Sequence, residues 1–205
     1  MPAIAVFEVM RNTSDPSRRY AGLAAQRVSS APDGYRQPEH FGYDFRDWVS
    51  PYTKGANTRG GIALVLQDWA SEDGLKGGPD ERIAELGRNP GIRTNKVLEA
   101  LLNRILGLSL SEVYATNAFP FVKRGGMSSP IPQKTVYATA RRFLLPELEI
   151  AEPRVIIALG SVARRTLESA GITCIHVPHP AARIGGLVAH EQAWRSALAG
   201  KVPIS

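Results

Sequence analysis

Four short segments carry side chains that could do chemistry, and each follows a run of apolar residues. The four are Gln67-Asp68-Trp69, Asn117-Ala118-Phe119-Pro120, Gly160-Ser161 and Pro178-His179-Pro180. They supply a carboxylate, an amide, a helix start of the size that binds a phosphate, and an imidazole. In an open parallel sheet, ligands bind just beyond the carboxyl ends of the strands. If the apolar runs are strands of one such sheet, the four segments converge on one edge and form a candidate site.

The elements that would position these segments alternate along the chain from Gly61 onward. Strands are expected where short apolar runs occur, and helices where apolar residues recur at three- and four-residue spacing. The expected strands are residues 62–66, 112–116, 154–159 and 173–177, and the expected helices are residues 94–106, 133–145, 161–169 and 189–198. This alternation predicts an α/β fold, a three-layer sandwich around a central four-stranded, mostly parallel sheet.

The first sixty residues differ in composition from the rest, because they are rich in the turn formers proline and glycine. We expect short helices and loops there, including a helix over residues 20–27, which wrap around the sheet. The aromatic-rich segment 41–51 either lines a cleft or caps the core. A chain of 205 residues fits one domain over residues 1–205, with residues 1–60 as its irregular and helical wrap.

Composition narrows the class of protein. Lysine and arginine number 25 and aspartate and glutamate 19, and the resulting net charge of +6 favours polyanionic partners. No apolar run approaches the ~20 residues that span a bilayer, and Met1–Met10 lacks the basic start of a secretory signal. The single cysteine, Cys174, excludes an intramolecular disulfide and a multi-cysteine metal site. We expect Cys174 to be a buried, inert thiol and the protein to be cytoplasmic.

The four segments resemble the motifs of the uracil-DNA glycosylase superfamily. Leu66-Gln67-Asp68-Trp69 is similar to its Gly-Gln-Asp-Pro segment, and Thr116-Asn117-Ala118 to the strand end with its base-reading asparagine. Ala158-Leu159-Gly160-Ser161 resembles its Gly-Ser helix start, and His179-Pro180-Ala181-Ala182 its His-Pro motif. The resemblance spans about residues 61–183, and over residues 93–167 the sequence is most similar to the iron–sulfur members. Four short motifs in the right order and spacing are more specific than any one of them.

The resemblance implies a role for each candidate residue. Asp68 and His179 would be catalytic: Asp68 assists the attack of water on the sugar, and His179 supports the departing uracil. The residues implied to contact the base are Gln67, Asn117, Trp69 and Phe119. The residues implied to contact the DNA backbone, or to fill the vacated base stack as a wedge, are Ser161, Arg183, Lys123 and Arg124. No metal or redox cofactor is required.

The chemistry of base excision explains these residue types. An asparagine amide can donate to uracil O4 and accept from N3–H, whereas cytosine reverses both groups, so one amide separates the two bases. A carboxylate stabilises the positive charge that develops on the sugar, by analogy with glycoside hydrolysis. A neutral histidine stabilises the negative charge on the departing base. The base must first leave the stack, which costs a few kcal/mol.

The sequence departs from the family pattern in three places. The four cluster-binding cysteines of the iron–sulfur members are missing, which excludes that cluster. Ala70 stands where a tyrosine commonly keeps out the methyl group of thymine, and Trp69 could supply that bulk. Residues 89–92 contain no aromatic ring for the base to stack on. Phe119, Trp69 or an aromatic of residues 41–48 could provide it, and the sequence does not choose among them.

The leading hypothesis is a monofunctional uracil-DNA glycosylase that acts as a monomer on uracil-containing DNA, with no membrane association. Its products would be free uracil and abasic DNA. The alternative is a DNA-binding protein of the same fold that recognises uracil or abasic sites without turnover. A third hypothesis, an enzyme of small nucleotides or nucleosides, leaves the Ser/Pro loop 128–132 and Lys123-Arg124 unexplained. A serine hydrolase is disfavoured, because Ser161 lacks the Gly-x-Ser-x-Gly elbow.

Overall fold

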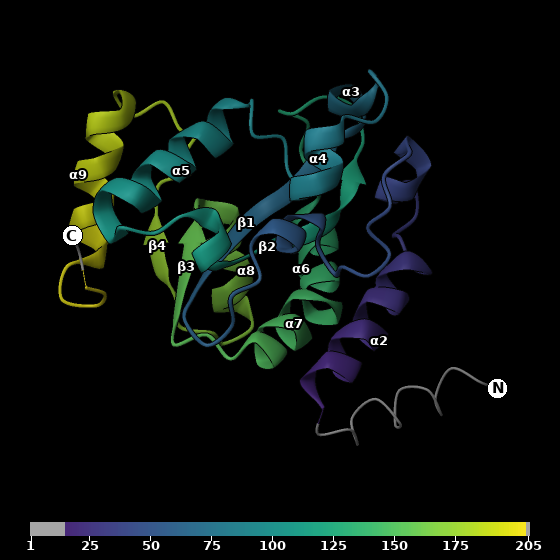
Figure 1. Ribbon diagram of the computed structural model, residues 1–205, viewed down its shortest axis with the longest axis horizontal. Helices are drawn as coiled ribbons and strands as arrows, with labels where there is room; N and C mark the ends of the chain where they lie inside the picture. The colour runs from purple at the N-terminus through teal and green to yellow at the C-terminus, as the bar shows by residue number, and fades with distance from the viewer. Residues whose placement is uncertain (1–14, 204–205) are drawn as a thin grey trace.

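The computed structural model describes residues 15–203, so the expectation for Met1–Met10 lies outside the described residues. Its sheet has four strands, β1 (Ile62–Ser71), β2 (Tyr114–Lys123), β3 (Val155–Leu159) and β4 (Ile175–Val177), in the order β2-β1-β3-β4. Every neighbouring pair is parallel. The strands lie side by side in Figure 1, and β1 and β3 are the two inner strands of the sheet.

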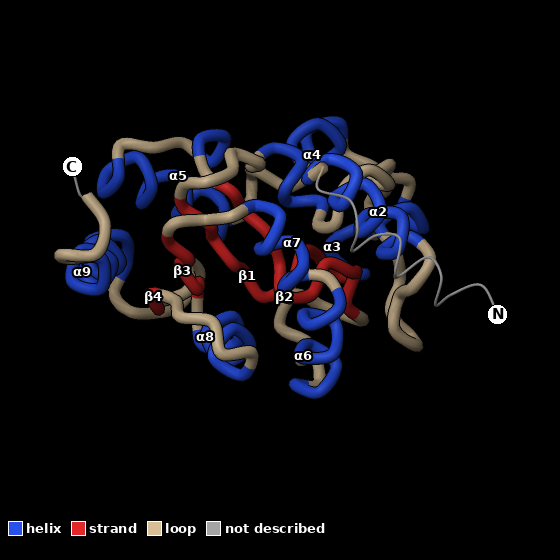
Figure 2. Tube along the Cα trace, turned by 90° about the horizontal axis from the view of Figure 1, so that it is seen from below, coloured by secondary structure: helices blue, strands red, loops and turns tan. Residues whose placement is uncertain are grey.

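Helices cover both faces of this sheet and create two cores. On one face, α5 (Arg93–Leu106) and α9 (Gly186–Leu198) bury leucines and Trp194 against the strands. On the other face lie α6 (Gln133–Arg142), α7 (Leu144–Ala151) and α8 (Ser161–Ser169), together with α2 (Pro16–Val28). Figure 2 shows α5 on one side of the strands and α6 and α8 on the other. The predicted three-layer α/β sandwich is confirmed.

The first two strands are longer than their apolar runs predict, and this changes where the candidate residues lie. β1 continues through Ser71 instead of ending near residue 66, and β2 covers residues 114–123 instead of 112–116. The two strands stay paired, with Leu66 beside Asn117 and Asp68 beside Phe119, until a β-bulge between Asp68 and Ala70 shifts the register. Asp68 and Asn117 therefore lie within strands, whereas sequence reasoning placed them beyond the strand ends.

Local chemistry explains the differences between the expected and observed helices. The expected helix over residues 133–145 is two helices that meet at Phe143, because Pro146 lacks an N–H and its ring would clash with the carbonyl of Arg142. α2 starts earlier than expected, at Pro16, where the Asp15 side chain accepts a hydrogen bond from Ser17 N. Two short helices between β1 and α5 were not predicted, α3 (Glu72–Leu75) and α4 (Glu81–Leu86).

The described part of the N-terminal wrap is fastened by one buried arginine. The Arg27 side chain is fully buried and donates hydrogen bonds to Gln37 and Glu39 and to the carbonyl oxygens of Phe45 and Trp48. These contacts hold α2, the 3-10 helix Pro38–Phe41 and the aromatic-rich segment together. A second 3-10 helix, Pro51–Gly55, follows and leads to β1.

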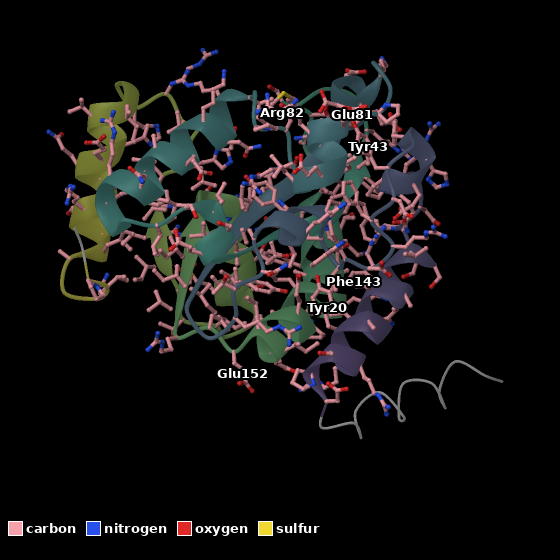
Figure 3. The ribbon with its side chains drawn as sticks, in the orientation of Figure 1. Tyr20, Tyr43, Glu81, Arg82, Phe143 and Glu152 are labelled. Atoms are coloured by element: carbon pink, nitrogen blue, oxygen red, sulfur yellow. The ribbon has the colours of Figure 1, made fainter. Side chains whose placement is uncertain are left out.

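The aromatic-rich segment caps the core, which settles one of the two alternatives for it. Tyr43 and Phe45 are buried and stack at a ring separation of 5.7 Å. Figure 3 draws the side chains of the described residues, with Tyr43 at the upper right and Tyr20 and Phe143 near α2. Cys174 is half-buried, not fully buried as expected. No helix within residues 15–203 is long and apolar enough to cross a membrane.

A carboxyl group, that of Glu147, is fully buried beneath the start of β2. It accepts hydrogen bonds from Thr53 Oγ1 at 3.0 Å, Tyr114 OH at 2.9 Å and Thr116 Oγ1 at 2.6 Å. Burial raises the pKa of Glu147 from 4.5 to about 7, although the three hydroxyl donors oppose the change. The folded protein therefore holds a proton here that the unfolded chain releases near pH 4.5.

We predict that this group makes stability depend on pH. The folded state binds the Glu147 proton more tightly, so the stabilisation is complete below about pH 4.5 and is lost as the pH rises through about 7. In Glu147→Gln, this fall in the free energy of unfolding should vanish, as measured by urea unfolding from pH 4.5 to 8. Glu149→Gln, at an exposed position of the same helix, is the control and should keep it. An unchanged slope in Glu147→Gln would contradict the assignment.

Candidate active site

A cavity of about 350 Å³ opens at the carboxyl ends of β1 and β2. Its walls come from residues 66–71 of β1, from segments 88–95 and 123–128, and from Tyr52 and His179. The volume is at the small end of the range for ligand pockets, which suits a single planar ring better than a large cofactor. Of the predicted catalytic and base-binding residues, the structure brings Gln67, Asp68, Trp69 and His179 to this cavity.

Asp68 is fixed at the cavity wall by two neighbours. Lys123 Nζ lies 3.1 Å from Asp68 Oδ2 and 3.4 Å from Oδ1, and Gln67 Nε2 donates to Oδ1 at 2.8 Å. The Asp68 side chain is 15% exposed and that of Lys123 only 5%. A second hydrogen bond joins Lys123 Nζ to the carbonyl oxygen of Met127. The carboxylate is therefore held by a nearly dry ion pair.

The position of Lys123 corrects its predicted role. The resemblance implied that Lys123 contacts the DNA backbone or acts as a wedge, but the structure buries its side chain in the wall of the cavity. The cause is the length of β2, which stays paired to β1 as far as Ser71 and Lys123. This pairing brings the lysine alongside the outgoing end of β1 and its carboxylate.

His179 lies in the loop after β4 and reaches the same cavity. Its Nδ1 accepts a hydrogen bond from Ala181 N at 3.2 Å, which assigns the proton of the neutral ring to Nε2. Burial lowers the pKa of His179 below 6.5, the charge of Asp68 opposes this change, and His190 and Lys123 add to it. The imidazole is thus neutral at pH 7 and has an N–H to donate.

Gly160 makes room for this histidine. Its φ is +89°, and a Cβ at this position would lie 3.0 Å from His179 Cβ. Gly160 N donates to Val177 O at 2.9 Å, which ties the start of α8 to the end of β4. A glycine is therefore required both by the backbone conformation and by the close approach of the ring.

Two aromatic side chains belong to the cavity wall, Trp69 and Tyr52. The Trp69 indole donates to Gly87 O at 2.7 Å and makes edge contacts with Tyr43 and Phe45. The aromatic-rich segment thus supports the wall from behind. Tyr52, which was not predicted as a base contact, donates its hydroxyl to Asn95. The only signal for it in the sequence was the run of aromatics that precedes it.

The structure does not bring Phe119 or Asn117 to the cavity. Phe119 is fully buried in the core, in edge contact with Tyr35 and Phe121, so it is not available for stacking on a base. Asn117 is 1% exposed, and its Oδ1 accepts from Ser50 Oγ at 2.7 Å. Its Nδ2 has no partner among the described residues. All ten residues of β2 are buried, which explains why both side chains are enclosed.

The remaining predicted contacts lie outside the cavity lining. Ser161 is exposed at the first turn of α8, and Arg183 is exposed four residues after His179. Both side chains are accessible to a DNA backbone. Arg124 donates to Gly34 O and lies over the ring of Tyr35 at 5.8 Å, so it fastens a loop of the wrap. Residues of the segment 88–95, with Asn89 and Asn95 in the wall, were not predicted.

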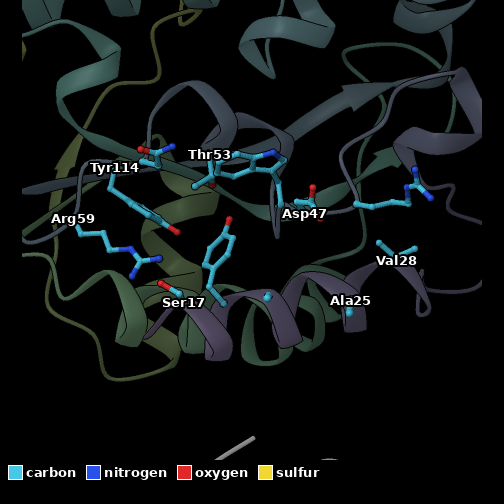
Figure 4. Close-up of a pocket in the computed structure, with 12 residues that line it drawn as sticks. Ser17, Ala25, Val28, Asp47, Thr53, Arg59 and Tyr114 are labelled. Carbon is cyan, nitrogen blue, oxygen red and sulfur yellow. The ribbon is translucent and has the colours of Figure 1, made fainter. Parts of the chain in front are cut away.

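A larger hollow, of about 640 Å³, lies elsewhere, between α2 and residues 46–59 (Figure 4). Thr53, Arg59 and Tyr114 face it near the amino ends of β1 and β2. None of the residues predicted to be catalytic lines it. Because ligands of parallel sheets bind at the carboxyl ends of the strands, the smaller cavity is the candidate active site.

A family model described as the uracil DNA glycosylase superfamily matches residues 76–197 of the chain. The match covers more than half of the sequence and includes β2, the Gly160 turn and His179. The chain belongs to this superfamily. Membership supports a DNA glycosylase type of activity with DNA as the substrate. The match begins after Asp68, and the structure joins Asp68 to the matched residues through its ion pair with Lys123 and the cavity that it shares with His179.

We predict that Gly160→Ala disturbs the candidate active site while Gly171→Ala does not. Both glycines have positive φ, +89° and +74°, so each substitution should cost about 1–3 kcal/mol of stability, measured by urea unfolding. A Cβ meets His179 only at position 160, since nothing lies within 4 Å at position 171. Base release from DNA should therefore slow more in Gly160→Ala. Equal rates in two variants of equal stability would contradict this role.

Proposed function

We propose that this protein flips uracil out of DNA and hydrolyses its N-glycosidic bond, leaving an abasic site. The observation that carries the proposal is the presence of an ionisable carboxylate, Asp68, and a neutral imidazole, His179, in one base-sized cavity. Cleavage of this bond leaves positive charge on the sugar and negative charge on the base. A carboxylate stabilises the charge on the sugar, and a hydrogen-bond donor stabilises the charge on the base.

The two side chains would act on opposite sides of the bond. The Asp68 carboxylate stabilises the oxocarbenium-like sugar and orients the attacking water, while Gln67 and Lys123 fix its oxygens. His179 donates its Nε2–H to uracil O2 as the base departs. Trp69 and Tyr52 are the aromatic surfaces available for the base to stack on. A held carboxylate and a held imidazole need little rearrangement during the reaction, which favours the transition state.

Base selection would depend on asparagine side chains. Asn117 would read uracil only after the chain around it moves, because it is 1% exposed. Its unpartnered Nδ2 supports such a role, since a base acceptor that reached it would satisfy a buried donor. Asn89 in the cavity wall is a second amide within reach of a bound base.

One observation favours the alternative of a lesion-binding protein without turnover. Lys123 neutralises the charge of Asp68, and a neutralised carboxylate stabilises a cationic sugar less well. Such a protein would give a uracil-dependent, salt-sensitive complex with DNA and no product.

Asp68→Asn tests the proposal directly. The variant keeps the size of the side chain but loses the charge, so uracil release should slow by about 100-fold or more. The assay uses matched oligonucleotides with one uracil, thymine or hypoxanthine, and alkali reveals the abasic sites. Single and multiple turnover are compared. Asp44→Asn removes an exposed carboxylate and should leave the rate unchanged. A gel shift without cleavage by the wild type would instead establish the binding protein.

Ala70→Tyr tests how the cavity treats the methyl group of thymine. Ala70 lines the cavity beside Trp69, and its small side chain leaves space that a tyrosine would fill. We expect measurable thymine release by the wild type and a larger loss on thymine than on uracil in the variant. The ratio of the two single-turnover rates is the measurement. A ratio that does not change would show that Ala70 does not face the base.

A further inference from the structure

Lys123 is a buried amine in the reaction cavity, and hydrolysis of the glycosidic bond does not use it as a nucleophile. Its side chain is 5% exposed, so it cannot serve as an ordinary surface contact for phosphate. Among the described residues that line this cavity, Lys123 is the one lysine. Lysine amines enclosed in such sites form covalent imines with carbonyl substrates.

The product of base excision supplies such a carbonyl. Once the base has left, C1′ of the abasic sugar is in equilibrium between a closed hemiacetal and an open aldehyde. Asp68 is proposed to lie against C1′, and Lys123 Nζ is 3.1 Å from Asp68 Oδ2. A carboxylate and an amine in contact would therefore face the same carbon atom. The carboxylate also provides the base that an ammonium group needs before it can attack.

We propose that Lys123 attacks C1′ of the abasic sugar and that the protein is therefore also an abasic-site lyase. This inference rests on the proposed function, because that function places Asp68 against the sugar. It changes the expectation of a monofunctional enzyme. The substrate class is DNA with an abasic site, formed in place or encountered already formed.

The reaction balances with groups that the cavity holds. Lys123 passes a proton to Asp68, and its free amine adds to the C1′ aldehyde to give a carbinolamine. Asp68 returns the proton to the departing hydroxyl, so that water leaves and a protonated imine forms. The Asp68 carboxylate then removes a C2′ proton, the C3′–O bond breaks, and the 5′-phosphorylated strand leaves. Asp68 passes the C2′ proton to the departing phosphate, and water hydrolyses the protonated imine, which restores the Lys123 ammonium group and releases the unsaturated aldehyde.

The surroundings of Lys123 hold the amine in place for this chemistry. Its second hydrogen bond goes to the carbonyl oxygen of Met127 in the loop after β2. Met127 is 62% exposed and also lines the cavity. If this loop contacts the DNA, it would fix the position of the Lys123 amine relative to the DNA strand.

The test is reduction of the imine by borohydride. Oligonucleotides with one preformed abasic site, or with one uracil, are incubated with wild-type protein and sodium borohydride. A covalent complex is then sought by denaturing electrophoresis, and the modified peptide is identified by mass spectrometry. We expect a complex with both oligonucleotides and an adduct on Lys123. Lys123→Arg keeps a cation beside Asp68 but cannot form an imine, so its complex should be lost. Lys96→Arg, at an exposed position of α5, should behave as the wild type.

The outcomes separate the two proposals. Uracil release that only alkali reveals, with no covalent complex on either oligonucleotide, would uphold the glycosylase and overturn the lyase. A complex on the preformed abasic site without uracil release would uphold the lyase chemistry and overturn the proposed substrate. An adduct mapped to another amine, or one that persists in Lys123→Arg, would overturn the role of Lys123. Peptide mapping on the wild type decides the case even if a variant fails to fold.

Discussion

The ion pair between Asp68 and Lys123 is the interaction on which the site depends. Removing two charges from water is costly, and their attraction compensates only when the remaining hydrogen-bonding capacity is also satisfied. Here Gln67 occupies one carboxylate oxygen and the Met127 carbonyl takes a second hydrogen bond from the ammonium group. A change to either charge leaves the other buried and unpaired. Such a pair fixes geometry more than it adds stability, and fixed geometry is what an active site requires.

The pair exists because β1 and β2 remain together beyond their apolar segments. The bulge between Asp68 and Ala70 changes the register by one residue and leaves Ser71 beside Lys123. The same extension buries all of β2, which encloses Asn117 and Phe119. One feature of strand pairing thus gives the cavity its lysine and removes two of its expected base contacts.

Most of the fold, but only part of the candidate site, could be predicted from the sequence. Apolar runs and helical spacing located the strands and the main helices, since burial on both faces dictates those patterns. Asp68 and His179 could be assigned to one cavity because the carboxyl ends of parallel strands share an edge. The place of Lys123 could not be predicted, because a strand ends where pairing stops, and pairing depends on residues far apart in sequence. Asn95 and Tyr52 were missed for a related reason, since their hydrogen bond forms only after folding.

The N-terminal wrap has a larger share in the site than its irregular composition indicates. The superfamily match begins at residue 76, yet Tyr52 forms part of the cavity wall, and Tyr43 and Phe45 support Trp69 from behind. These aromatic side chains are held in turn by the hydrogen bonds of buried Arg27 to the backbone of the same segment. Asp68 comes from the sheet and His179 from the loop after β4, while the wrap contributes Tyr52 to the cavity wall and the support behind Trp69. Under the proposed function, discrimination between bases can therefore change through the wrap without any change in Asp68 or His179.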